Sequence, residues 1–349
     1  MNVTVHQRPG VYSAYDASSV VSGSGGGKQV GLVAVNTKAT ANEVKIVTSY
    51  DGAVNAFGQG TMAELIRLAL KNGAGSVAAV PIASGEGYGD GFAALEGLED
   101  VTAVLCDSTD GDVQKAMKES VETASANRRE RIAVAAGGAE ETVDELIARA
   151  KALNHERVVL VAPGGVDKSG ENTDGLGVAA AVAGAIAGES DPAVPLGGAV
   201  LTGLYGLSGR YNDGEMDRLI LGGVTPVESL AGTMVVVRGV TTRTTTGEAA
   251  DATWRDLTTI RIVDDVIPTL RRALRAKFQR AKNTAQSRGA IRAQVVLELE
   301  NKKAREIITG YENVTVTADS QDPARCLVDF SFTVAHGLNQ IWLTAHITV

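Results

Sequence analysis

Three short apolar stretches follow one another, VTAVLC at residues 101–106, IAVA at 132–135 and VVLVA at 158–162, with polar segments between them. The polar segments, 110–126 and 140–153, carry apolar residues at the spacing of an amphipathic helix. Strands that are apolar throughout and alternate with helices are typical of a parallel sheet that is covered on both faces. This part of the chain therefore predicts an α/β fold.

The same alternation extends in both directions from this stretch. Further strands are expected at residues 30–35, 44–48, 76–81 and 198–202, and further helices at 61–71 and 175–187. We expect these elements to form one α/β core domain over residues 28–226. The helix at 175–187 opens with a glycine pattern typical of dinucleotide binding, but no strand immediately precedes it. Packing of small residues against the sheet is the better explanation.

The pattern changes after Pro226. A strand at residues 234–240 is followed by a helix that we expect to open at Asp264, and then by a second helix at 290–309. Three strands with alternating apolar residues come last, at 314–317, 326–335 and 341–349. These elements predict a C-terminal α+β domain over residues 227–349, in which about 337–349 form a C-terminal arm.

Both ends of the chain have the pattern of a single strand. Met1, Val3 and Val5 alternate with polar residues, and a Pro-Gly turn and a Ser/Gly-rich linker at 18–27 separate them from the core. Residues 1–27 therefore predict an N-terminal arm and linker. A lone strand is stable only when another strand pairs with it. Each terminal strand is thus either an ordinary sheet edge or a strand exported to another chain.

The composition, with 44% hydrophobic and 21% charged residues, is that of an ordinary globular protein. The longest apolar run, residues 176–188, is too short to span a membrane, and the polar start MNVTVHQRPG does not resemble a signal peptide. Cys106 and Cys326 lie far apart, each in an apolar stretch. We therefore expect two buried thiols, synthesis in a reducing cytosol, and neither a disulfide nor a metal site.

The net charge of −8 is unevenly distributed. Residues 271–305 contain eleven Lys or Arg and two Glu, a net charge of +9, which leaves −17 for the rest of the chain. A basic block in an acidic chain indicates an electrostatic partner. An acidic protein surface is favoured, an ordinary solvated helix face comes next, and nucleic acid comes last, because the basic face lacks interleaved aromatic or amide side chains for base recognition.

The motifs that would indicate catalysis are incomplete. A phosphate-binding loop around residues 23–28 fails because Ser22 and Gln29 stand at two of its required positions. The pentapeptide around Ser208 ends in arginine, where a nucleophile elbow needs glycine. His155 is expected at the surface or at a helix end, and the acidic pair Asp264-Asp265 at a helix N-terminus, where carboxylates are favourable. The sequence therefore predicts no catalytic, cofactor-binding or metal-binding residue.

Several segments resemble the contractile tail sheath proteins of bacteriophages and of phage-derived particles such as R-type bacteriocins. Arg8-Pro9-Gly10-Val11-Tyr12 is similar to the N-terminal arm motif of that family. Residues 31–34, 46–49 and 56–58 resemble the start of its core. Residues 222–226, 238–242 and 254–265, with the long basic helix, resemble its C-terminal sheath domain. The motifs occur in the family's order and cover most of the chain.

The resemblance implies a subtilisin-like, non-catalytic α/β core joined to a C-terminal α+β domain. It implies a structural subunit, not an enzyme, that polymerises as stacked hexameric rings around an inner tube and contracts to drive the tube through a target cell envelope. It also implies that the terminal arms add strands to sheets of neighbouring copies. The arm residues expected in these contacts are Val3, Val5, Pro9, Val11, Tyr12, Ile341, Leu343, Ala345, Ile347 and Val349.

We further expect Arg271, Arg272, Arg275 and Lys282 to project from the basic helix toward an acidic inner tube. The implied partners are other copies of the chain, the inner tail tube protein, and baseplate and tail terminator proteins, with no direct nucleic acid, no stable membrane insertion and no cofactor. The protein would be made in the bacterial cytoplasm and reside in a virion tail or a released contractile particle. Two other functions stay open: an α/β hydrolase-like enzyme and a basic-helix nucleic-acid-binding protein.

Overall fold

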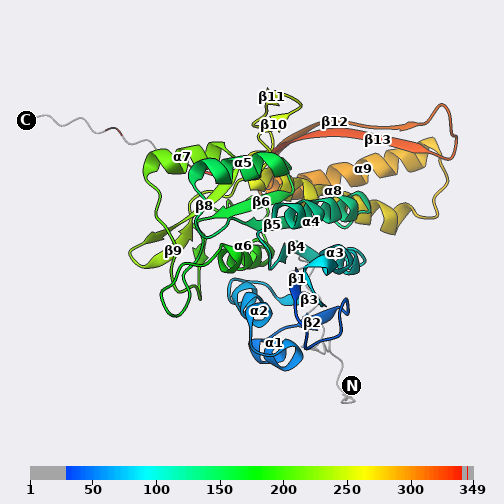
Figure 1. Ribbon diagram of the computed structural model, residues 1–349. Coiled ribbons are helices and arrows are strands. Elements are labelled where there is room, and N and C mark those ends of the chain that lie inside the picture. The colour runs from blue at the N-terminus through cyan, green and yellow to red at the C-terminus, as the bar shows by residue number, and fades with distance from the viewer. Residues whose placement is uncertain (1–28, 340–343, 345–349) are drawn as a thin grey trace, which may run out of the picture.

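A nine-stranded sheet is the centre of the molecule in the computed structural model, which describes residues 29–339 and 344 (Figure 1). Six neighbouring strands from β3 to β8 run parallel, while β2, at one edge, and β9, next to the other, are antiparallel to their neighbours. In order across the sheet the strands are β2 (Lys45–Val47), β3 (Ser76–Ile82), β1 (Gln29–Val35), β4 (Val101–Cys106), β5 (Ile132–Ala136), β6 (Val158–Ala162), β8 (Val224–Leu230), β9 (Thr233–Val236) and β7 (Val200–Leu201).

Helices cover both faces of this sheet, as the alternating pattern predicted. One face packs against α1 (Tyr50–Phe57), α2 (Thr61–Lys71) and α6 (Leu176–Gly188). The other packs against α3 (Tyr88–Glu96), which follows the short helix η2 (Gly85–Gly87), and against α4 (Gly111–Ala126), α5 (Val143–Leu153) and α7 (Asp213–Leu221). Every residue of β5 and β6 is buried between these two layers.

Small residues explain how α6 packs on the sheet directly beside α2. A Cβ atom added to Gly184 would lie 2.3 Å from the carbonyl oxygen of Ala69, and one added to Gly188 would lie 2.7 Å from the Cα of Gly73. Real atoms do not approach this closely, so glycine is required where the two helices meet. The glycines of α6 are thus packing residues, but the close neighbour is α2 and its C-terminal end and not the predicted sheet.

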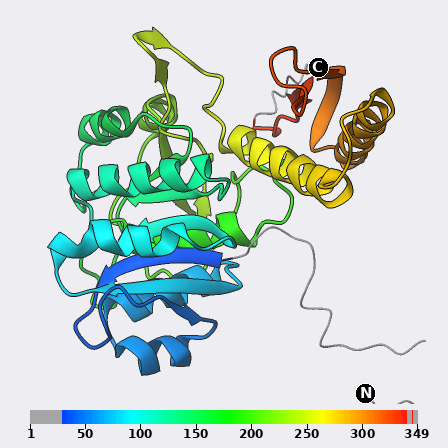
Figure 2. The same cartoon turned by 90° about the vertical axis from the view of Figure 1, so that its right-hand side faces the viewer.

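A second unit stands to one side of the large sheet (Figure 2). It contains α8 (Leu257–Phe278), α9 (Ala285–Ala304) and a hairpin of β12 (Ile308–Ala318) and β13 (Cys326–Val334). Ile262 and Val266 of α8 pack with Val295 and Leu299 of α9 in a separate buried cluster under the hairpin. A small hairpin of β10 (Thr245–Thr246) and β11 (Ala249–Ala250) precedes this unit.

Several predicted boundaries are wrong in this second unit. The helix predicted from Asp264 begins at Leu257, so Asp264 and Asp265 lie inside α8 and not at its N-terminus. The helix predicted to reach residue 309 ends at Ala304, where Glu306 adopts a left-handed backbone conformation with φ 58°. The strand predicted at 314–317 spans all of β12, because pairing with β13 recruits the residues on either side.

The predicted domain boundary after residue 226 falls inside β8, and the sheet continues to Val236. The division into 1–27, 28–226 and 227–349 itself stays a prediction, and residues 1–28 lie outside the described part. Cys106 is buried, and burial raises the pKa of its thiol to about 12. Cys326 is only half-buried, contrary to the prediction, because it lies at the start of the incompletely covered β13. Among the described residues, no helix has the length and apolarity needed to cross a membrane.

Candidate assembly interface

The hairpin of β12 and β13 forms a two-stranded sheet of its own, separate from the nine-stranded sheet. Across residues 29–339, no third strand pairs with either of its outer edges. Along β13, half-buried and exposed residues alternate over the whole length of the strand. Phe330 and Phe332 belong to the half-buried set, their ring centroids lie 6.2 Å apart, and both pack against the buried cluster of α8 and α9.

An apolar strand face that is half-buried in the isolated chain leaves hydrophobic area available for burial by something else. The two open edges of the hairpin also present backbone N–H and C=O groups that no neighbouring strand pairs with. A two-stranded sheet is marginal by itself, and added strands stabilise it. The hairpin can therefore accept strands from outside the described residues.

The structure divides the basic block into paired and exposed residues. Arg271 is held by Glu130 of the core, with Nη2 2.9 Å from Oε1. Lys302 is buried and paired with Asp265. Arg272 and Arg275 are exposed on α8, whereas Lys282 follows the end of the helix and is exposed in the connection to α9. Lys282 was therefore wrongly placed on the helix, and of the four residues only Arg272 and Arg275 share its exposed surface.

A buried ion pair that the sequence analysis missed joins α8 to the core. The guanidinium of Arg157 donates two hydrogen bonds to the carboxylate of Asp264, at 2.6 and 2.8 Å. Their side chains are 13% and 16% exposed, so the pair is largely removed from water. Burial raises the pKa of Asp264 to about 6, and Arg157 offsets part of that rise. The acidic pair within α8 thus serves to anchor this helix through Asp264 and to hold α9 through Lys302.

His155 lies beside this anchor, directly after the end of α5, which is one of the two predicted positions, and it is largely buried instead of lying at the surface. Its Nε2 is 3.0 Å from Oε1 of Glu122, and its Nδ1 accepts a hydrogen bond from the backbone N–H of Arg157. Burial lowers the pKa of the imidazole. Because Nδ1 is an acceptor and Nε2 faces a carboxylate, the neutral ring with the proton on Nε2 fits this position. Its role here is structural.

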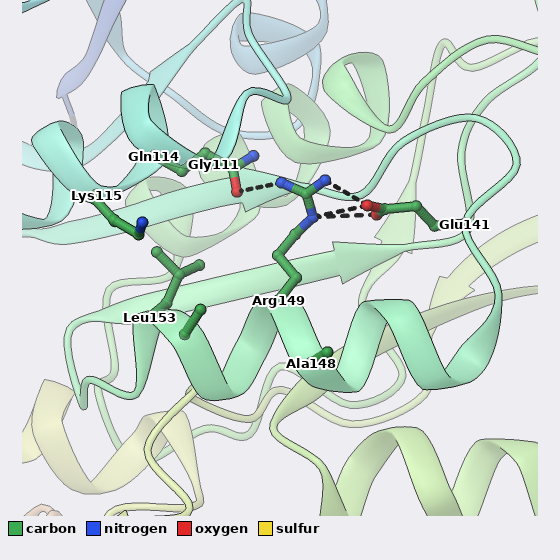
Figure 3. A pocket seen from close by; sticks show the side chains of 8 residues that line it. Gly111, Gln114, Lys115, Glu141, Ala148, Arg149 and Leu153 are labelled. Atoms are coloured by element: carbon green, nitrogen blue, oxygen red, sulfur yellow. Dashed lines mark hydrogen bonds and ion pairs between the residues drawn. The ribbon is translucent and has the colours of Figure 1, made fainter.

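A groove of about 330 Å³ lies between α4 and α5 (Figure 3). Arg149 is the one arginine in its lining, and the guanidinium already donates hydrogen bonds to the carboxylate of Glu141, the backbone carbonyl of Thr109 and the side-chain oxygen of Gln114. The lining residues are Gly111, Gln114, Lys115, Glu141, Ala148, Arg149, Ala152 and Leu153. The groove holds no Ser, Cys or His that could act as a nucleophile or base. Within the described ranges, no three His, Cys, Asp or Glu side chains gather as metal ligands would.

Two family models match the chain, one after the other along its length. The model of the phage tail sheath protein central domain matches residues 83–242, and that of the phage tail sheath C-terminal domain matches residues 249–348. These two matches follow one another in the chain and cover most of it. The chain belongs to the phage tail sheath family, and it is a structural tail protein, not an enzyme.

Solved structures share the fold. The sheath tail protein of Desulfitobacterium hafniense gives a TM-score of 0.71 at 13% identity and covers 93% of this chain and 100% of its own. The contracted helical sheath of the anti-feeding prophage gives 0.74 at 18% identity, covering 98% and 99%. The contracted sheath complex of the extracellular contractile injection system PVC gives 0.69 at 19% identity, covering 99% of both chains. Comparison with curated proteins finds no match.

The predicted arm residues lie outside the described part of the chain. These are Val3, Val5, Pro9, Val11, Tyr12, Ile341, Leu343, Ala345, Ile347 and Val349. Their pairing with other copies therefore stays a prediction. The group that the sequence analysis missed is the Arg157–Asp264 anchor, because nothing in the sequence links these two residues. The alternation within residues 326–335 predicted a strand with one apolar face, and β13 confirms it.

Proposed function

We propose that the chain polymerises as stacked hexameric rings around an inner tail tube and contracts to drive that tube through a target cell envelope. The observation that carries the proposal is the hairpin of β12 and β13, with its two open edges and half-buried apolar face. In this proposal the terminal arms of neighbouring copies add strands to the hairpin sheet. The core is a subtilisin-like sheet without protease residues, consistent with its parallel strands and two helical layers.

Strand addition suits a polymer that must change shape without falling apart. Each backbone hydrogen bond contributes about 1 kcal/mol net, so several of them make a firm link between two bodies. The link constrains the paired strands and leaves the attached cores able to rotate. Contraction then requires a second packing of the cores that is favoured by a small free energy per copy and summed over the polymer.

The inner tube is the proposed partner of the basic surface made by Arg272 and Arg275 of α8, with Lys282 in the following connection. These side chains are exposed, so they can form contacts in water that are firm at low salt and weaken as salt rises. Arg271 contributes less to such a contact, because Glu130 already neutralises it.

Baseplate and tail terminator proteins are proposed to bind the two ends of the polymer. The anti-feeding prophage baseplate structures contain a chain of this fold, with TM-scores of 0.73 and 0.71. The protein would be made in the bacterial cytoplasm and reside in a virion tail or a released contractile particle, without direct contact to nucleic acid.

Negative-stain microscopy of the purified chain tests the assembly directly. We expect striated hollow tubes from the full chain, and soluble folded protein without tubes when residues 341–349 are deleted. Circular dichroism checks that the shortened protein keeps its fold. A full chain that stays monomeric at high concentration would contradict the proposal.

The tube contact is tested by charge reversal. The double variant R272E/R275E should lose co-sedimentation with the inner tube protein in low salt, because two attractive contacts become repulsive. The control is K115E, which reverses an exposed lysine on α4 of the core and should co-sediment as the parent does. Unchanged binding by the double variant would remove these residues from the tube contact.

A further inference from the structure

The loop that follows α6 reaches from the core to the second unit. The carbonyl of Glu189 accepts a hydrogen bond of 2.9 Å from Nη2 of Arg261 on α8. Asp191 then orders the turn, because its side-chain oxygen accepts a hydrogen bond of 2.9 Å from the backbone N–H of Ala193. Ala193 in turn packs against the buried cluster of α8 and α9. The loop of residues 189–195 therefore belongs to the core and is also held by the second unit.

The chain returns to this loop after it leaves β13. The backbone N–H of Ala335 donates a hydrogen bond to the carbonyl of Ile307, which keeps the chain beside the start of β12. Two residues later, Gly337 lies against Pro195. A Cβ atom added to Gly337 would lie 2.8 Å from the Cβ and 2.9 Å from the Cγ of this proline. Real atoms do not approach this closely, and the proline ring cannot rotate away, so only glycine fits here without displacing the chain.

A groove of about 640 Å³ surrounds this contact. Residues of three segments line it: 191–195 in the loop, 303–309 at the end of α9 and the start of β12, and 335–338 after the hairpin. Leu338, which follows Gly337 directly, is 76% exposed. The close contact at Gly337 thus comes at the point where the chain leaves a seat that the core and the second unit form together.

We propose that Gly337 is a positioning residue for assembly, and that its contact with Pro195 sets the direction in which residues 341–349 leave the body toward a neighbouring copy. The inference rests on the proposed function and deepens it. Because the core and the second unit both hold the loop of residues 189–195, the contact gives the C-terminal segment a fixed starting point relative to each of them. This starting point exists before any second copy binds.

The physical reason is the cost of ordering a chain segment when it binds. Each residue whose backbone becomes fixed loses conformational entropy, and a segment that already starts in the right direction loses less of it on binding. Nine residues span about 30 Å when fully extended, so a small change of angle at position 337 displaces the far end much more than the start. A side chain at this position would cause such a change.

Gly337→Ala in the full chain tests this role. The added methyl group would overlap Pro195, so we expect the protein concentration needed for polymerisation to rise about tenfold, as measured by sedimentation and checked by microscopy. The urea midpoint of the monomer should change little, because Pro195 and Gly337 are only half-buried. The control is Gly289→Ala, since a Cβ atom added at this exposed position of α9 points into open space. This control should polymerise as the parent does.

Pro195→Gly tests the other side of the contact. It removes the ring and should itself raise the concentration needed for polymerisation, while Gly337→Ala should add little further loss to a chain that already carries Pro195→Gly. Polymerisation of either single variant at the parent's concentration, or an equal loss from Gly337→Ala in both backgrounds, would overturn the inference. A loss of polymerisation that is matched by a lower urea midpoint would also overturn it, because the role would then be merely structural. Absence of polymer from the parent itself would instead contradict the proposed function.

Discussion

The nine-stranded sheet and the two-stranded hairpin sheet differ in how far the chain buries their side chains. In the large sheet, β5 and β6 have every residue buried, because the chain supplies a helical layer for each face. In the hairpin, β13 has no fully buried residue although it is longer than either of those strands. One sheet is covered on both faces within the chain, and the other keeps open edges and a half-buried apolar face. In the proposed function, the first sheet stabilises each copy and the second joins copies together.

The largest effect is expected where the two regions are joined. Arg157→Ala removes the partner of the buried Asp264 carboxylate and should cost about 3–5 kcal/mol of unfolding free energy. Urea denaturation measures this cost. The double variant R157M/D264L removes both charges and should recover most of the loss, because no unpaired charge remains. If the single variant unfolds at the parent's urea midpoint, the anchor is not a significant link between the core and α8.

The next prediction separates the two sheets by their burial. Leu160 in β6 is fully buried, so Leu160→Ala should cost about 2–5 kcal/mol of unfolding free energy. Phe330 in β13 is half-buried, so Phe330→Ala should cost only about 1 kcal/mol in the monomer. The same Phe330→Ala variant should raise the protein concentration needed for polymerisation, since assembly buries the rest of this ring. Equal losses of monomer stability in the two variants would show that the hairpin is already complete.

The smallest effect concerns pH. Burial lowers the pKa of His155 below the 6.5 of a free imidazole, so its contribution to stability is present above pH 6.5 and is lost as pH falls through the lowered value. Asp264 acts in the opposite sense, because its raised pKa of about 6 means that protonation from about pH 6 down to 3.8 favours the folded state. His155→Gln should therefore make the urea midpoint rise more, or fall less, between pH 7 and 5 than it does in the parent. If the urea midpoint of His155→Gln changes with pH as that of the parent does, His155 does not contribute to the pH dependence of stability.

Much of the core could be predicted from the sequence because its strands are continuously apolar. In a layered α/β fold, a short and continuously apolar run such as VVLVA at 158–162 fits only as a strand that is buried on both faces. The structure has β6 at those residues. Boundaries were harder in the C-terminal unit. The sequence around Asp256 is typical of a loop, and Asp264 resembles the start of a helix. In the structure α8 already begins at Leu257, and the carboxylate of Asp264 inside it pairs with Arg157, which lies 107 positions earlier in the chain. Tertiary pairing of this kind leaves no local pattern.

Part of the candidate assembly interface could also be predicted, because its apolar residues follow the spacing of a strand. The alternation of residues 326–335 indicated a strand with one apolar face, and β13 confirms it. The bulges of β12, where its register with β13 shifts, were not predictable, because Thr309 and Asn313 fit a regular strand or a turn equally well in the sequence. The basic block was visible as charge, but its division into paired and exposed residues depends on which carboxylates the fold brings near.

Hydrogen exchange of the β13 backbone, measured on monomer and polymer of the same full chain, tests most directly whether assembly completes the hairpin sheet. We expect amides on the free edge of β13 to exchange rapidly in the monomer and to become strongly protected in the polymer, while the amides of β5 and β6 are protected in both. Exchange in β13 that is equally slow in the monomer, or equally fast in the polymer, would contradict it.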